Sequence, residues 1–278
     1  MQTHKKNFLI IFGANSLLFK EILLHINLKK FNLIFISRSN PKIEFSIKFH
    51  FIKWQMGKKI NLNALKIIKN KNIFLLNFIH DWSETNINVH INNHCQFIRI
   101  IQQLEIELKK SFFKIFISSL SSLNNPSNIY GKIKNQLNKL YYANNYLIFN
   151  IGLITGSLKF SIYKKIHESA KNKILFLPKT NTPLQIIHIK KISTTLEYLL
   201  KNEIFIKKKS LNISSYKHYS LEQLINLFNK NKKIIIKINL DIILLIYFVL
   251  YKLGIIKFQN YDSLCGLKRR YCAIPKFK

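Results

Sequence analysis

Residues 8–19 read FLIIFGANSLLF, and this stretch decides the fold. The apolar run Phe8–Phe12 is short enough for one strand, and Gly13 follows it directly. From residue 17 to residue 23 the leucines and isoleucines recur at helical spacing. A buried strand, a glycine turn and an amphipathic helix in this order begin an α/β unit.

The same alternation of apolar runs and helical periods continues to about residue 151. Further strands are expected at Leu33–Ser37, Glu44–Trp54, Ile73–Ile79, Phe113–Ile117 and Tyr146–Ile151. Helices are expected at Asn63–Lys69, Asn88–Leu108 and Asn128–Asn144. Strands that alternate with helices predict an α/β fold with a doubly wound, Rossmann-type parallel sheet. We expect this domain to occupy residues 1–156 and a small C-terminal lobe to occupy residues 157–278.

The formal charge of +33 comes almost entirely from lysine, because only four of the 45 basic residues are arginine. Lysine, asparagine and isoleucine are spread evenly along the chain, as expected of an AT-rich genome. A nucleic-acid surface usually clusters its charge and favours arginine, so no specific nucleic-acid partner is expected. The three cysteines, Cys95, Cys265 and Cys272, are scattered without a CxxC pair, which suits a reducing compartment.

Several short segments have a characteristic order and spacing. They are residues 8–19, FISSLSS at 116–122, the YxxxK motif YGKIK at 130–134, NIGLITG at 150–156 and IHIK at 187–190. Together they resemble the extended short-chain dehydrogenase/reductase superfamily, which includes the NAD-dependent nucleotide-sugar epimerases. Residues 260–267, NYDSLCGL, are similar to the ending of these enzymes. The resemblance implies a dinucleotide-binding domain followed by a substrate-side lobe.

The resemblance implies catalytic roles for Ser119, Tyr130 and Lys134. A tyrosine with a pKa of about 10 is a poor base at neutral pH unless a cation lies near its oxygen. Tyr130 and Lys134 are four residues apart on an expected helix, so they share a face, and the ammonium is expected to lower the phenol pKa. Ser119 would hydrogen-bond the substrate oxygen, although Ser121 remains an alternative.

The cofactor loop departs from the GxxGxxG pattern of the family, because its three positions read Gly13, Ser16 and Phe19. Phe19 is expected either to force the helix away from the strand or to fill space that another residue has vacated. The cofactor-binding residues implied for this loop are Gly13, Asn15, Ser16, Leu17 and Leu18. We expect NAD or NADP as the cofactor, with binding weakened by the lost glycines.

Two more residues are candidates for the cofactor site. Arg38 directly follows the second strand, where the resemblance implies an acidic residue that would bind the ribose of NAD. Arg38 is therefore a candidate to pair with the 2′-phosphate of NADP or to stack on the adenine, or else it is an exposed strand-end charge. His80 follows the fourth strand, where it would line or obstruct the nicotinamide pocket. No metal site is expected, because His90 and His94 share a helix face but lack a third ligand.

Near the C-terminus, Ile242–Tyr251 is an uninterrupted apolar stretch. It is shorter than the roughly 20 residues that span a bilayer, so a buried helix or an interfacial helix with peripheral membrane contact is expected. The resemblance places the protein in the cytoplasm or at the inner face of the membrane, and it is compatible with a homodimer.

Two functions follow from these features. The first is NAD(P)-dependent epimerisation or oxidoreduction of a nucleotide-linked or lipid-linked sugar in surface polysaccharide biosynthesis. The second is a non-catalytic Rossmann-fold scaffold or accessory subunit that has lost cofactor turnover. The altered glycine loop favours the scaffold, whereas Ser119, Tyr130 and Lys134 favour the enzyme.

Overall fold

The computed structural model describes residues 7–43, 47–60, 65, 68, 72–81, 84–180, 182–202, 210–215, 217–228 and 234–268. The chain divides into two compact units that interleave along the sequence. The first comprises residues 1–118, 136–149 and 189–211, and the second comprises residues 119–135, 150–188 and 212–278. Each unit is described in turn.

A seven-stranded sheet with the strand order β10-β6-β5-β4-β1-β2-β3 confirms the predicted α/β class. Its strands are β1 (Asn7–Phe12), β2 (Phe31–Ser37), β3 (Phe49–Lys53), β4 (Ile73–Asn77), β5 (Phe113–Ser119), β6 (Leu147–Ile151) and β10 (Ser210–Ile213). The neighbouring pairs β1–β2, β1–β4, β2–β3 and β4–β5 are parallel. The chain therefore reverses direction across the sheet between β1 and β4, as in a Rossmann fold.

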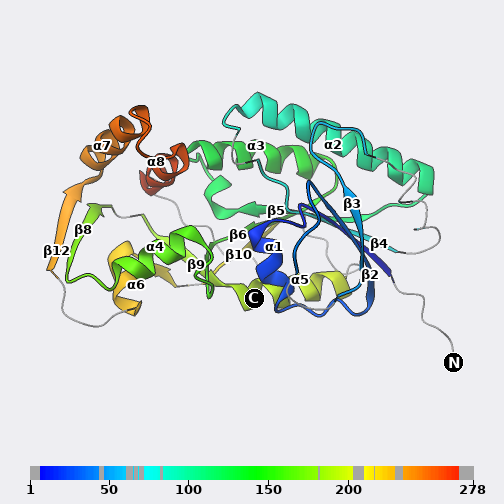
Figure 1. Ribbon diagram of the computed structural model, residues 1–278, viewed down its shortest axis with the longest axis horizontal. Coiled ribbons are helices and arrows are strands. Elements are labelled where there is room, and N and C mark those ends of the chain that lie inside the picture. The colour runs from blue at the N-terminus through cyan, green and yellow to red at the C-terminus, as the bar shows by residue number, and fades with distance from the viewer. Residues whose placement is uncertain are drawn as a thin grey trace. The chain divides into compact units, whose positions relative to one another are not determined.

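Helices cover both faces of this sheet. Figure 1 shows α2 (Ile87–Leu108) on one face and α1 (Leu17–Leu23) with α5 (Ile189–Lys201) on the other. The central strands β1 and β4 are almost completely buried, because apolar side chains on both of their faces meet helices. The helix expected at Asn63–Lys69 falls on residues of which only Leu65 and Ile68 are described.

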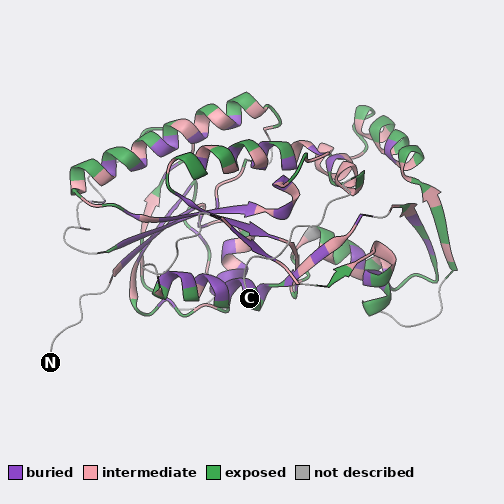
Figure 2. Cartoon of the chain, turned by 180° about the vertical axis from the view of Figure 1, so that it is seen from behind, coloured by how far each residue is buried: buried purple, intermediate pink, exposed green. Residues whose placement is uncertain are grey.

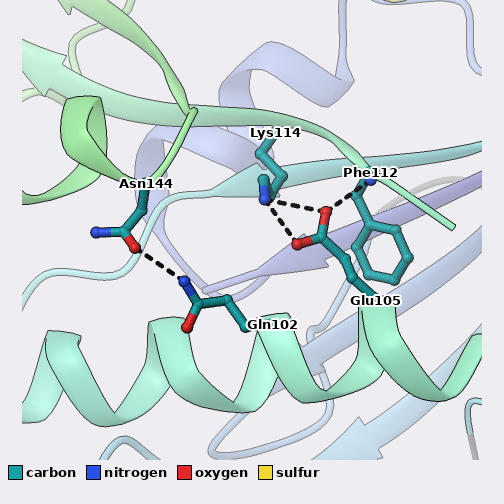
Figure 3. Close-up of polar contacts among 5 residues, drawn as sticks. All are labelled: Gln102, Glu105, Phe112, Lys114 and Asn144. Carbon is teal, nitrogen blue, oxygen red and sulfur yellow. Dashed lines mark hydrogen bonds and ion pairs between the residues drawn. The ribbon is translucent and has the colours of Figure 1, made fainter. Parts of the chain in front are cut away.

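An ion pair fastens α2 to the start of β5 (Figure 3). Lys114 Nζ lies 2.8 Å from Glu105 Oε2, and its side chain is only 8% exposed. Glu105 Oε1 also accepts a hydrogen bond from the backbone N–H of Phe112 at 2.8 Å. Nearby, Gln102 Nε2 donates to Asn144 Oδ1 at 3.0 Å. These contacts fix the helix against the sheet at the edge opposite the carboxyl ends of the strands.

The described residues of the second unit form two small sheets. β11 (His218–Tyr219), β9 (Leu184–His188) and β7 (Leu153–Thr155) form one, and β12 (Ile234–Asn239) pairs in parallel with β8 (Ile174–Lys179) to form the other. The helices are α3 (Ile129–Ala143), which begins in this unit, α4 (Ser161–Ser169), α6 (Leu221–Phe228), α7 (Leu240–Lys252) and α8 (Phe258–Cys265). A core that includes Leu175, Leu177, Leu224 and Ile225 holds β8, α4 and α6 together.

Candidate functional site

The turn after β1 lies at the carboxyl edge of the sheet, where parallel sheets bind ligands. Gly13 has a φ of +75°, a conformation that side chains disfavour. A Cβ atom at Gly13 would lie 3.0 Å from the carbonyl carbon of Phe78 and 3.1 Å from the backbone nitrogen of Ile79. Only glycine therefore allows this turn to lie against the chain that leaves β4.

Ser16 is the N-cap residue of α1, and its hydroxyl is engaged within the helix. Its Oγ accepts a hydrogen bond from the backbone N–H of Phe19 at 3.2 Å. The N–H groups of Leu17 and Leu18 lie in the first helical turn and have no acceptor within the helix. They are the donors of this turn that suit the pyrophosphate of a dinucleotide, and the positive end of the helix dipole adds to their effect.

Phe19 occupies the third glycine position and fills the space between α1 and the sheet. Its side chain is 1% exposed, and its ring centroid lies 5.3 Å from those of both Phe35 and Phe78. The ring therefore packs into the core against β2 and the chain that leaves β4. The turn thus has strand–turn–helix geometry with a phenylalanine at this position.

The turn after β1 is tied to the end of β2. Asn15 Nδ2 donates hydrogen bonds to the carbonyl oxygen of Ser39 at 3.0 Å and to its Oγ at 2.7 Å. The neighbouring Arg38 is exposed at the carboxyl end of β2. Asn15 therefore holds the two loops together, and Arg38 is available to a phosphate or to an adenine ring.

His80 begins a row of histidine rings beside β4. Its half-buried ring stacks on that of His90, with centroids 5.4 Å apart and planes 12° apart. His90 Nε2 lies 3.0 Å from the carbonyl oxygen of Glu84, and His94 Nδ1 forms a short hydrogen bond with the Tyr141 hydroxyl. Within the described part of the chain, no three His, Cys, Asp or Glu side chains are arranged to hold a metal ion.

In the second unit, Ser119 and Tyr130 come together. Ser119 ends β5, and its side chain forms a hydrogen bond with the Tyr130 side chain. Ser121 Oγ donates to Ser119 Oγ at 2.9 Å, so Ser121 supports Ser119. Lys134 lies one turn after Tyr130 on α3 and is 4% exposed. All three side chains are therefore held by adjoining segments of this unit.

The electrostatics of this group differ from the sequence expectation. Burial raises the pKa of Tyr130 to about 12, although the hydrogen bond with Ser119 acts in the opposite direction. Burial also lowers the pKa of Lys134 to about 7. Removal from water disfavours both the phenolate and the ammonium, and this effect outweighs any attraction between them. In the protein without ligands, Tyr130 is thus a proton donor at neutral pH.

The helix that carries Tyr130 begins on a carboxylate from the end of the chain. Asp262, on α8, accepts hydrogen bonds from the backbone N–H of Ile129 at 2.7 Å and from that of Tyr130 at 3.0 Å. Asn128 Nδ2 donates to the same carboxylate at 3.3 Å. Asp262 is 7% exposed, so these hydrogen bonds replace water around a buried charge. It caps α3 and sets the position at which Tyr130 enters the helix.

Gly131, inside the YGKIK motif, leaves room for this arrangement. A Cβ atom there would lie 2.5 Å from the carbonyl oxygen of Ser121 and 2.6 Å from Asn128 Oδ1. Neither Gly131 nor Asp262 was predicted from the sequence as a site residue. A usable signal was present for Asp262, because the chain contains only three aspartates and this one lies in the segment similar to the family's ending.

The glycines of the segment at 150–156 are also explained by close contacts. A Cβ atom at Gly152 would collide with the carbonyl oxygen of Gln185, and Gly156 has a φ of +91° with the His188 ring against it. Gly152 and Gly156 lie directly before and after β7, and the residues that they contact, Gln185 and His188, belong to β9. The His188 ring therefore packs against the backbone at Gly156, beside the β7–β9 pair.

Comparison with solved structures supports the fold. The UDP-N-acetylglucosamine 4-epimerase of Bacillus cereus is 14% identical and aligns with a TM-score of 0.61 over 84% of this chain and 86% of its own. The UDP-glucuronic acid 4-epimerase of Bacillus cereus in complex with NAD is 15% identical, with a TM-score of 0.58 over 82% and 87%. The UDP-glucose 4-epimerase of Thermotoga maritima with UDP-glucose is 9% identical, with a TM-score of 0.57 over 82% and 85%.

The chain has the fold of the UDP-sugar 4-epimerases. This confirms the Rossmann-type architecture that the sequence resemblance predicted. At the level of sequence, no family model and no curated protein matches the chain.

Proposed function

We propose that the protein is a divergent extended short-chain dehydrogenase/reductase that epimerises or oxidises a nucleotide-linked or lipid-linked sugar with NAD or NADP. The observation that carries the proposal is the hydrogen-bonded pair Ser119 and Tyr130, with the buried Lys134 one helical turn away. Similar folds are found in proteins solved with NAD and with UDP-glucose. A role in surface polysaccharide biosynthesis is part of the same proposal.

The residues of the first unit suit a dinucleotide, although Ser16 and Phe19 stand where glycines would let the pyrophosphate approach the backbone more closely. The N–H groups of Leu17 and Leu18 would bind the pyrophosphate, and Arg38 would contact the 2′-phosphate or the adenine. Gly13 would let the cofactor approach the backbone, while His80 would border the nicotinamide half. A bound nicotinamide supplies the hydride acceptor and donor.

In the second unit, Ser119 would donate a hydrogen bond to the sugar oxygen that reacts, and Tyr130 would exchange a proton with the same oxygen. Tyr130 must lose its proton to act as a base, so its pKa has to fall from about 12 when the site fills. Lys134, with a pKa of about 7, is partly an ammonium at neutral pH, and its charge favours the phenolate.

Replacing Tyr130 by Phe tests this role. We expect turnover of UDP-sugars to fall by at least about 100-fold, since a general acid or base contributes roughly 10²–10⁴. Cofactor binding should be retained. The matched control is Tyr142→Phe, which alters an exposed tyrosine on the same helix and should leave turnover unchanged. Equal turnover in Tyr130→Phe and the wild type would exclude the proposed role.

The second candidate function is a scaffold without turnover. The hydroxyl of Ser16 is already engaged as a helix cap, and Phe19 has become a core residue, so the loop has adapted to the loss of two glycines. A scaffold would show no turnover with any UDP-sugar and no saturable binding of either nicotinamide dinucleotide.

A further inference from the structure

The β8–β12 pair carries exposed apolar side chains on its outer face. Alternate residues of β8 point inward to the core, and those between them point outward. The strand register places Ile234 opposite Ile174 and Ile236 opposite Phe176. These four side chains are 63%, 50%, 42% and 64% exposed, respectively. The inner face of the β8–β12 pair packs on the core of the second unit, and its outer face is apolar and exposed.

Helix α7 follows β12 directly and carries a second group of exposed apolar side chains. Its exposed apolar residues Ile242, Leu245, Ile246 and Val249 recur at spacings of three and four and line one side of the helix, and Leu253, directly after the helix, extends this row. Phe248 is also exposed, beside the row. Among the residues of α7, Leu244 alone is buried. Figure 2 accordingly shows most of α7 in the colour of exposed residues. We call these α7 residues and the outer residues of β8–β12 the apolar face.

Exposure on this scale needs an explanation, because single apolar residues on a surface are ordinary but contiguous groups mark an interaction site. α7 contacts both β8 and β12, so the two parts of the apolar face belong to one local structure. No helix among the described residues is long and apolar enough to cross a membrane. α7 is apolar around nearly its whole circumference, and only Leu244 is buried, so most of this apolar surface is left exposed.

The charged residues near the apolar face indicate which partner covers it, a second copy of the chain or an anionic membrane. The exposed Lys173 precedes β8 and the exposed Lys179 ends it, while Lys252 ends α7 and Lys257 lies a few residues beyond it. The nearby acidic side chains do not offset these charges. Glu222 is paired with Lys237 at 2.9 Å, and Asp241 with Lys268 at 2.8 Å.

A second copy of the chain would bring like charges together on burying this face, and each copy carries a formal charge of +33. An anionic bilayer would accept the apolar side chains and attract the lysines. We therefore propose that the apolar face docks the protein on anionic phospholipid membranes, with α7 parallel to the surface. This inference does not depend on the proposed catalysis.

Vesicle co-sedimentation tests the inference. The purified full-length protein is mixed with vesicles of phosphatidylcholine alone or with added phosphatidylglycerol, at low and at moderate salt. The wild type should bind the anionic vesicles and keep measurable binding at moderate salt. Its general positive charge would bind any anionic surface at low salt, so the moderate-salt measurement isolates the apolar contribution.

The variants Phe176→Glu and Leu245→Glu should each weaken binding at moderate salt by at least about tenfold, because a large apolar side chain no longer enters the interface. The matched control is Ile106→Glu on α2, which replaces an isoleucine that is 76% exposed outside the apolar face and should bind as the wild type does. Circular dichroism and thermal unfolding confirm that each variant is folded.

Two outcomes would overturn the inference. In the first, Phe176→Glu and Leu245→Glu bind the vesicles as tightly as the wild type and the control do, which would mean that charge alone holds the protein to the vesicles. In the second, the wild type is a dimer by light scattering, Leu245→Glu is a monomer and no vesicle binding survives at moderate salt. The apolar face would then belong to a contact between two copies.

Discussion

Replacing Lys134 by Met should stabilise the protein at low pH while removing its activity. The Lys134 pKa falls from its ordinary value of 10.5 to about 7 because the side chain is buried. Between these two values the unfolded chain holds a proton on this amine and the folded chain largely does not. Folding therefore costs the most below pH 7, where both states are charged, and the cost declines as the pH rises toward 10.5.

The size of the effect follows from the shift. At about 1.4 kcal/mol per pKa unit, the full cost below pH 7 is at most roughly 5 kcal/mol. Between pH 6 and pH 9 the wild type should gain roughly 2–3 kcal/mol of stability relative to Lys134→Met. Above pH 10 the raised pKa of Tyr130 lowers the stability of both proteins, because the phenol ionises first in the unfolded chain.

Urea unfolding of both proteins at pH 6, 7.5 and 9 measures this difference, and turnover is assayed in parallel. We expect the variant to be more stable at pH 6, with the gap closing as the pH rises. A difference in stability that does not change with pH would refute the argument, because Lys134 would then be an ordinary lysine with no shifted pKa.

Three further substitutions test the structure around this group. Asp262→Ala removes the cap of α3 and should lower the free energy of unfolding by about 2–4 kcal/mol, measured in urea. The control Asp241→Ala breaks an exposed ion pair and should lower it by less than about 1 kcal/mol. Similar losses in the two variants would argue against the capping role. Glu105→Gln leaves the buried Lys114 ammonium without its anion and should lower the free energy of unfolding by about 3 kcal/mol. A loss below about 1 kcal/mol in the same assay would show that this pair is solvated. Gly131→Ala should lower the melting temperature and turnover together, and a folded variant with full turnover would show that the close approach at this glycine is not needed.

Much of the fold could be predicted from local patterns. The helix expected at Asn88–Leu108 is α2, and the strand expected at Phe113–Ile117 lies within β5, because long periodic and fully apolar segments leave few alternatives. The strand expected to begin at Glu44 begins instead at Phe49, and residues 44–46 lie outside the described part of the chain.

The packing of Phe19 could not be predicted in the same way. Its position in the loop pattern indicated that a glycine was missing, but not where the ring would go. That outcome depends on Phe35 of β2 and on Phe78, directly after β4, which meet Phe19 only in the folded protein.

The candidate site was predictable in its residues but not in its electrostatics. The spacing of Tyr130 and Lys134 placed them on one helix face, yet the sign of each pKa shift depends on burial, which the spacing does not reveal. Asp262 is far from α3 in the sequence, so no local pattern pointed to its cap on that helix.

Binding of nicotinamide dinucleotides tests the central claim most directly. Calorimetric titration of the wild type with NADH and with NADPH is run at moderate salt, so that the positive charge of the protein does not bind phosphates unspecifically. The account predicts saturable binding of one or both cofactors, and Arg38→Ala should weaken the binding of NADPH more than that of NADH. The absence of saturable binding for both cofactors would contradict the account and leave a Rossmann-fold scaffold without its cofactor.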